Sequence, residues 1–343
     1  MTYLPSPNEL FEGLRRAYFL YYNTPFRLRN EVLNRERQER LDIAGGVWQE
    51  PLVEIRPRYS TTSRTLTETT RYVGAVPELA EFASLGMLKG IPSLYLHQEE
   101  ALREAVRGVD IAATPGTGSG KTELLFLPIL AALLRESATW SSGSAQQQRW
   151  WDIAGNPFIP QRTDEVGRPA AVRAIVLYPM NALADDQLVR LRKALDSDAI
   201  HAWLDANRHG HRFFFGRYTG STPVLGRRGN QQAEDQLRTE MQRFEHNYNA
   251  ARAQSESKSF FLPRPQGAEM ISRWDMLETP PDILITNYSM LHVMLMRAQE
   301  QPIFEQTRDW LCSNPDQRLT LVVDESHLYR GTAGTEVAYM FRL

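Results

Sequence analysis

The sequence contains a single cysteine, Cys312, among 343 residues, which excludes an internal disulfide and a multi-cysteine zinc site. It also lacks a long apolar run, because the longest one, residues 124–134, is well short of the roughly 18 residues that a membrane span needs. Its first residues, 1–14, have no apolar core of the kind that a signal peptide needs. These absences predict a cytoplasmic protein with no membrane partner.

A surplus of positive charge is missing as well, since 39 Lys and Arg residues stand against 41 Asp and Glu residues. This balance disfavours nucleic-acid binding through bulk positive charge, but it is compatible with a local basic groove. Apolar residues make up 42% and charged residues 23% of the chain, as in an ordinary globular protein. The length predicts about two domains.

The first of these domains is expected to be a mainly helical region, residues 1–85. Ser6, Pro7 and Glu9 form the sequence pattern of a capping box, and apolar residues then recur at helical spacing. A second helical pattern covers about residues 26–41. The remaining residues, 86–343, are expected to form the second domain.

Within the second domain, short apolar runs alternate with helical patterns, which indicates an α/β fold with a mostly parallel central sheet. The runs are apolar at successive positions, as is typical of strands covered on both faces. The expected strands are 109–113, 174–178, 212–215, 283–286 and 319–323. The helical patterns between them are 123–135, 182–195 and 289–298. Two polar insertions interrupt the alternation, at about 136–171 and 226–281, and insertions of this length are commonly functional or disordered.

A glycine-rich segment, Pro-Gly-Thr-Gly-Ser-Gly-Lys-Thr at 115–122, lies between the first expected strand and the first helical pattern. Backbone N–H groups in such a turn and the positive end of the following helix favour phosphate binding. Lys121 can reach the β- and γ-phosphates of a nucleotide, and the Thr122 hydroxyl can ligate Mg²⁺. Pro115 stands where the strict pattern has glycine. The expected nucleotide-binding residues here are Gly116, Thr117, Gly118, Ser119, Gly120, Lys121 and Thr122.

Two carboxylates, Asp324 and Glu325, follow the apolar run that ends at Val323, and His327 comes shortly after them. Open α/β sheets bind their ligands at this end of the strands. Asp324 is suited to hold Mg²⁺ through water, and Glu325 is suited to accept a proton from an attacking water. With the phosphate loop, in this order, the pair indicates hydrolysis of a nucleoside triphosphate.

The Asp-Glu-Ser-His segment resembles the DExH box of superfamily 2 helicases and translocases, and other motifs resemble that family over about residues 94–336. Tyr-Leu-His-Gln at 95–98 resembles the segment whose Gln reads the adenine edge, so Gln98 is an expected ATP contact. Segments 178–187, 218–223 and 286–291 resemble motifs that hold the nucleic-acid backbone, with Asn181 standing where Lys or Arg is common. The residues expected at nucleic acid are Pro179, Asn181, Arg217, Thr219, Gly220, Thr286 and Asn287.

The amino-acid sequences of these motifs, together with the two insertions, resemble those of the large bacterial helicases of phage-defence systems such as DISARM and Druantia. The resemblance implies the first RecA-like domain of a DExH motor, which uses ATP and Mg²⁺ and moves on nucleic acid, with DNA expected. It implies that Lys121 and Glu325 are catalytic and that His327 couples hydrolysis to the nucleic-acid site. It also implies two kinds of partner, a second RecA-like domain and other defence-system subunits.

No motif of a second RecA-like domain follows the acidic box. The chain is therefore expected to be part of a larger protein and, alone, to bind nucleotide weakly and hydrolyse little of it. Two other functions remain open at this point. One is a P-loop NTPase that acts as a nucleotide switch without translocation, and the other is a non-catalytic nucleic-acid-binding module.

The expected strands end at Pro115, Pro179, Gly216, Asn287 and Asp324, which predicts one functional edge of the sheet. A basic cluster near two of these ends is compatible with either a solvated face or a contact to phosphates. It comprises Arg208, His209, His211, Arg212, Arg217, Arg227 and Arg228. Trp150 and Trp151 in the first insertion favour a local packing anchor over a wedge between bases.

Overall fold

The computed structural model describes residues 6–52, 58–114, 116, 118–141, 149–153, 155–162, 168–224, 228–340 and 342. The chain divides into two compact units, Met1–Arg58 and Tyr59–Leu343, each of which is described by itself. Among the described residues, no helix combines the length and the hydropathy that crossing a membrane requires.

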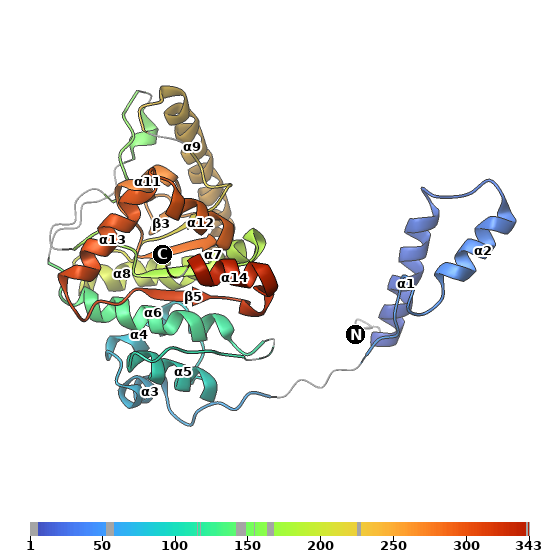
Figure 1. The fold of residues 1–343 in the computed structure, drawn as a ribbon, viewed down its shortest axis with the longest axis horizontal. Coiled ribbons are helices and arrows are strands. Elements are labelled where there is room, and N and C mark those ends of the chain that lie inside the picture. Colours follow the sequence, from blue (N-terminus) through green and yellow to red (C-terminus); the bar gives the residue numbers. More distant parts are fainter. Residues whose placement is uncertain are drawn as a thin grey trace. The chain divides into compact units, whose positions relative to one another are not determined.

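The first unit contains the helices α1 (Pro7–Asn23) and α2 (Glu31–Leu41) (Figure 1). The capping box predicted at the start of α1 is confirmed. The Ser6 hydroxyl accepts from the Glu9 N–H at 3.3 Å, and the Glu9 carboxylate accepts from the Ser6 N–H at 2.7 Å. Arg15 of α1 lies over the Trp48 ring and pairs with Asp42, which ties the helix to the segment after α2.

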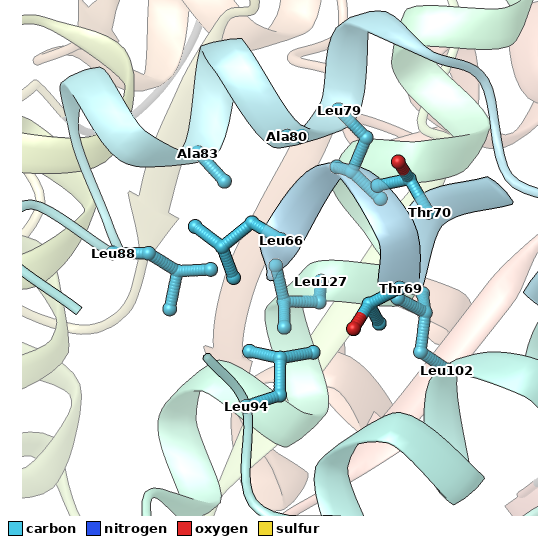
Figure 2. Close-up of a pocket in the computed structure, with 10 residues that line it drawn as sticks. All are labelled: Leu66, Thr69, Thr70, Leu79, Ala80, Ala83, Leu88, Leu94, Leu102 and Leu127. Carbon is cyan, nitrogen blue, oxygen red and sulfur yellow. The ribbon is translucent and has the colours of Figure 1, made fainter. Parts of the chain in front are cut away.

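The second unit begins at Tyr59, which is 27 residues before the expected start of the second domain at residue 86. Its first helices are α3 (Leu66–Val73), α4 (Glu78–Leu85), α5 (Leu96–Val106) and α6 (Lys121–Ser137). Figure 2 shows side chains of α3, α4 and α5 around Leu127 of α6, lining a cavity of about 10 Å³, which is room for about one water molecule. Residues 59–85 therefore belong to the main core, because their apolar side chains are buried against α6.

The rest of the second unit alternates helices and strands. Its remaining helices are η1 (Trp150–Asp152), α7 (Asn181–Leu195), α8 (Asp198–Asn207), α9 (Gln231–Gln254), α10 (Glu256–Ser259), α11 (Arg273–Glu278), α12 (Tyr288–Met296), α13 (Gln301–Ser313), η2 (Ser326–Leu328) and α14 (Gly331–Met340). Its strands are β1 (Ala174–Tyr178), β2 (Phe215–Tyr218), β3 (Glu269–Met270), β4 (Ile283–Asn287) and β5 (Thr320–Val323).

All strand pairs in the sheet are parallel, and the strand order is β3-β2-β4-β1-β5. The predicted α/β fold with a mostly parallel sheet is confirmed. Helices cover both faces, so the unit has three layers (Figure 1). Val176 and Ile285 pack toward α6, α7 and α8, whereas Leu177 and Leu284 pack toward α11, α12 and α13. The apolar residues at successive strand positions are explained by this double coverage.

Two expected strands differ in the structure. The run expected at 212–215 is shifted, since β2 begins at Phe215, and Gly216 lies inside the strand instead of at its end. Residues 109–113 form no strand, and Val109 and Ile111 are 51% and 41% exposed. An isolated extended segment has no backbone partner, and among the described residues the edge strand β5 pairs with β1 alone.

The two insertions, which the sequence separates by more than 50 residues, pack together. Trp150, Trp151 and Phe158 of the first insertion are buried with Leu237 and Met241 of α9 in a third apolar cluster. Figure 1 shows α9 standing at one end of the unit with the green segment of the first insertion beside it. The interpretation of the two tryptophans as a packing anchor is confirmed, because both rings are at most 3% exposed.

Candidate nucleotide and nucleic-acid site

The described part of the phosphate loop, residues 116 and 118–122, leads directly into α6. Gly120 caps the helix with a φ of 74°, in the left-handed region that favours glycine. A Cβ at this position would also collide with the Gln98 amide. Ser119 is fully buried, and among the described residues its hydroxyl has no hydrogen-bond partner. A buried donor without a partner, beside a helix N-terminus, fits a phosphate ligand. Pro115 and the predicted site residue Thr117 lie outside the described residues.

The acidic box meets the phosphate loop in space, although about 200 residues separate them. The Lys121 ammonium lies 3.5 Å from the Glu325 carboxylate. Glu325 adopts a φ of 49°, which is unusual for a residue with a Cβ, and its other carboxylate oxygen lies 3.2 Å from His327 Nδ1. The carboxylate of Glu325 therefore stands between the cation of the phosphate loop and the imidazole of His327.

Asp324 extends the pairing of the sheet, because its N–H donates to the Leu177 carbonyl at 3.0 Å. Burial raises the pKa of the Asp324 carboxyl, and the neighbouring Glu325 charge adds to this, although the Glu325 N–H and Lys121 oppose it. Burial also raises the pKa of the Tyr178 and Tyr329 hydroxyls, and the charge of Asp324 adds to both shifts. A partly desolvated carboxylate of this kind is suited to a cation.

The chemistry of a Mg²⁺ site fits these residues. Among the described residues no group of three or more His, Cys, Asp and Glu is arranged to hold a metal ion. Mg²⁺ with a nucleotide needs less protein, because phosphates and waters supply most of its ligands. Asp324 and the buried Thr122 hydroxyl are the protein oxygens that this site offers.

Gln98 is placed against the phosphate loop as well. Its amide nitrogen donates to the Gly120 carbonyl at 3.0 Å, and its amide oxygen accepts from the Tyr95 N–H at 2.9 Å. His97, for which the sequence suggested no role, lies with its Nε2 2.9 Å from the Ser119 carbonyl. Two neighbouring side chains at the start of α5 thus brace the loop. They are the second and third residues of α5, which begins directly after its N-cap residue Tyr95.

Tyr59 is a loop contact that the sequence analysis missed. A Cβ on Gly116 would lie 2.6 Å from the Tyr59 hydroxyl, so a larger residue there would have to displace the Tyr59 side chain. The Tyr59 ring packs on Tyr95 and His97, with centroids 5.7 and 5.3 Å apart. Nothing in the sequence marks Tyr59, because the motif segment begins more than 30 residues later.

The residues expected at nucleic acid gather along the same edge of the sheet. The register sets Tyr178 opposite Asn287 and Tyr218 opposite Thr286, so the ends of β1, β4 and β2 are adjacent. The Asn287 amide donates to the Asn181 side chain at 2.9 Å. This bond joins two of the three motif segments directly.

Several of these side chains make internal bonds. The Thr286 hydroxyl is buried and donates to the Tyr218 carbonyl at 2.6 Å, and Thr219 is also fully buried. Arg217 pairs with Asp185 of α7. Gly220, in contrast, is exposed and has open space where a Cβ would be. Pro179 is partly exposed directly after β1. Backbone groups near Gly220 and Pro179 are thus more open to a ligand than the threonine hydroxyls.

The basic cluster does not form one free cationic surface. Each of its described arginines lies within 4 Å of a carboxylate: Arg208 with Glu78, Arg212 with Asp205, Arg217 with Asp185 and Arg228 with Glu278. His211 is buried against the Ser141 carbonyl, and Arg227 lies outside the described residues. The positive charges of these arginines are therefore largely neutralised by the neighbouring carboxylates.

The three-layer fold, with the glycine-rich loop facing the acidic box, is the arrangement expected of a nucleotide-binding α/β domain. Residues 95–212 match the DEAD/DEAH box helicase family, so this part of the unit is similar to the helicase domains of that family. Its resemblance to defence helicases is confirmed by a relative, since the chain is 32% identical to the Druantia protein DruE of Escherichia coli (strain UMEA 4076-1). The alignment covers 97% of this chain and 19% of DruE, so the chain spans about a fifth of that protein's length.

Solved structures of the DUF1998 helicase MrfA are similar to this chain. One is bound to DNA and AMPPNP and has a TM-score of 0.43, and another is bound to DNA and has a TM-score of 0.44. Both are 20% identical to this chain, and the matches cover 84% of it and 25% and 26% of the MrfA chains.

Proposed function

We propose that the chain is the ATP-binding half of a helicase or translocase motor that acts on nucleic acid, with DNA as its substrate. The observation that carries this proposal is the 3.5 Å approach of Lys121 to Glu325, on the sheet edge where the motif segments of β1, β2 and β4 also end. One edge thus offers both a triphosphate site and a neighbouring backbone-binding site.

In this proposal each residue of the nucleotide site has a defined task. Lys121 binds the β- and γ-phosphates, and the turn from Gly116 to Gly120 holds them with its N–H groups. Bound Mg²⁺ would neutralise phosphate charge, and Thr122 and Asp324 would hold it. Glu325 accepts a proton from the attacking water, and Gln98 contacts the adenine. His327, 3.2 Å from Glu325, transmits the state of the site to nucleic acid.

The expected partners follow from the same proposal. A second RecA-like domain would close over the nucleotide and supply an arginine that stabilises the charge of the transition state. Such an arginine can raise turnover by about 10³- to 10⁵-fold. The identity to a Druantia protein supports antiviral defence in the bacterial cytoplasm as the setting, with other subunits of such a system as further partners.

The test is a pair of binding titrations on the purified chain, one with fluorescent ATP and Mg²⁺ and one with labelled DNA and RNA strands. We expect weak, Lys121-dependent nucleotide binding, little hydrolysis, and nucleic-acid binding that tolerates any sequence and falls steeply with salt. Lys121→Ala should remove most of the ATP affinity. Nucleotide binding without nucleic-acid binding would favour the switch NTPase, and the reverse would favour the non-catalytic module.

A longer protein that contains this chain allows the decisive assay. Its ATPase rate should rise when DNA is added, because a motor couples ATP hydrolysis to movement along the nucleic acid. Robust DNA-stimulated turnover by the isolated chain as a monomer would contradict the proposal that it is half of a site. A rate that rises with the square of concentration would mean that two chains complete each other.

A further inference from the structure

The two insertions form one folded module, here defined as the described residues of 149–162 and 228–279. Its two parts exchange buried polar contacts in addition to the shared apolar cluster. Arg238 of α9 donates to the carbonyls of Trp150 and Ile153 at 2.8 and 2.7 Å. Trp151 Nε1 donates to Glu245 of α9 at 2.8 Å. Neither insertion could keep this arrangement without the other.

The short helix α11 joins this module to the sheet. Ser272 and Asp275 form a capping box at its start, and Asp275 also accepts from the Gln161 N–H at 2.9 Å, which anchors the helix to the first insertion. Trp274 of α11 packs edge-on against Phe158, with ring centroids 5.5 Å apart. Arg273, the residue before Trp274, does not join this aromatic contact, because its side chain is directed toward Thr219.

Arg273 reaches the loop that follows β2, at residues 219–223. Its guanidinium is buried, donates to the Thr219 carbonyl at 2.7 Å and lies 4.9 Å from the centre of the Tyr218 ring. Its backbone N–H donates to the Pro223 carbonyl at 3.2 Å. One residue of the insertion module therefore holds both ends of this loop.

The loop is fixed everywhere except at its tip. The Thr222 hydroxyl accepts from the Thr219 N–H at 2.9 Å and donates to the Arg217 carbonyl at 2.6 Å. Gly220 and Ser221 are exposed, and Gly220 has open space where a Cβ would be. The geometry points to Arg273 as a positioning residue: through it, the insertion module presents the Gly220 backbone to a nucleic-acid phosphate. This inference rests on the proposed function, because it assigns the module a task at the same nucleic-acid site.

The experiment measures binding of a short fluorescein-labelled DNA strand by the whole chain and by Arg273→Met and Arg273→Lys. Loss of one charge-assisted hydrogen bond to the loop should weaken DNA binding by Arg273→Met about tenfold. Lysine can still donate to the Thr219 carbonyl, so Arg273→Lys should recover part of the loss. Arg149→Met is the matched control, because Arg149 lies in the same module but pairs with Glu245.

Two further readouts separate positioning from other roles. The buried guanidinium makes no phosphate contact in this proposal, so the slope of log affinity against log salt should be unchanged in Arg273→Met. A decrease of about one would mean direct contact and would overturn the inference. Hydrogen exchange of the amides of Thr219 and Thr222 should be faster in the variant, whereas that of β1 and α6 should not change.

The outcomes are distinguishable. If the unmodified chain binds no nucleic acid, the proposed function fails and the inference with it. If the chain binds DNA but Arg273→Met binds it as tightly, the inference alone fails. Equal losses of DNA affinity, nucleotide affinity and thermal stability in both Arg273 variants would mean a general structural role, which also overturns it.

Discussion

The ion pair between Lys121 and Glu325 competes with the nucleotide for the lysine, so Glu325→Gln should bind nucleotide more tightly than the unmodified chain. At 3.5 Å and an effective dielectric constant of about 20, the Coulomb attraction would be about 5 kcal/mol. The two side chains are 41% and 29% exposed, so water screens the pair, and its worth is at most about 1 kcal/mol. Freeing Lys121 should therefore tighten nucleotide binding by up to about fivefold.

The assay is a titration with fluorescent ATP and Mg²⁺ at low and high salt, since screening should shrink the gain as salt rises. Glu278→Gln is the matched control, because Glu278 also pairs with a cation, Arg228, but lies in the insertion module. In a longer protein that contains this chain, Glu325→Gln should at the same time lose turnover, because the Glu325 carboxylate acts in the hydrolysis step. Weaker nucleotide binding by Glu325→Gln would refute the competition, and unchanged turnover would refute its assignment as the base.

Three other substitutions probe the site and its support. Gln98→Ala should weaken binding of ATP more than of GTP in a competition titration; equal losses would mean that Gln98 only braces Gly120. Asp282 is fully buried and pairs with the buried guanidiniums of Arg168 and Arg173. Asp282→Asn should cost about 3–5 kcal/mol in urea unfolding, because it removes the carboxylate from these buried ion pairs; a loss under 1 kcal/mol would contradict this. Asp324→Asn should abolish Mg²⁺-dependent nucleotide binding, yet raise the melting temperature without Mg²⁺ at neutral pH. An unchanged or lower melting temperature would contradict the burial cost assigned to Asp324.

The pH dependence of the last two variants has opposite sign. Burial raises the pKa of Asp324, so the folded state holds that proton more tightly than the unfolded state, and the stabilising effect of Asp324→Asn should appear as pH rises above about 4. Burial alone would raise the pKa of Asp282 too, but Arg168 and Arg173 hold it below its ordinary value. Its contribution is therefore present above pH 4 and is lost only as pH falls through the lowered pKa.

The sequence by itself determined the class of the fold, and it predicted the residues of the proposed nucleotide site. Gly120, Lys121 and Asp324 are set by local patterns, because a glycine-rich turn before a helix and a carboxylate after an apolar run are readable at short range. Strands with apolar residues at successive positions likewise predicted the covered parallel sheet. Local information was enough wherever the determinant lay within a few residues of its effect.

Tertiary structure decided what joins distant parts of the chain. The unit boundary at Tyr59, the brace of Gly116 by Tyr59 and the pairing of the basic cluster depend on which side chains meet in space. Residues 109–113 have the composition of a strand, but among the described residues no strand pairs with them. The joint module of the two insertions, and the reach of Arg273 to the Thr219 carbonyl, arise because burial of aromatic side chains brings together segments that no spacing in the sequence connects.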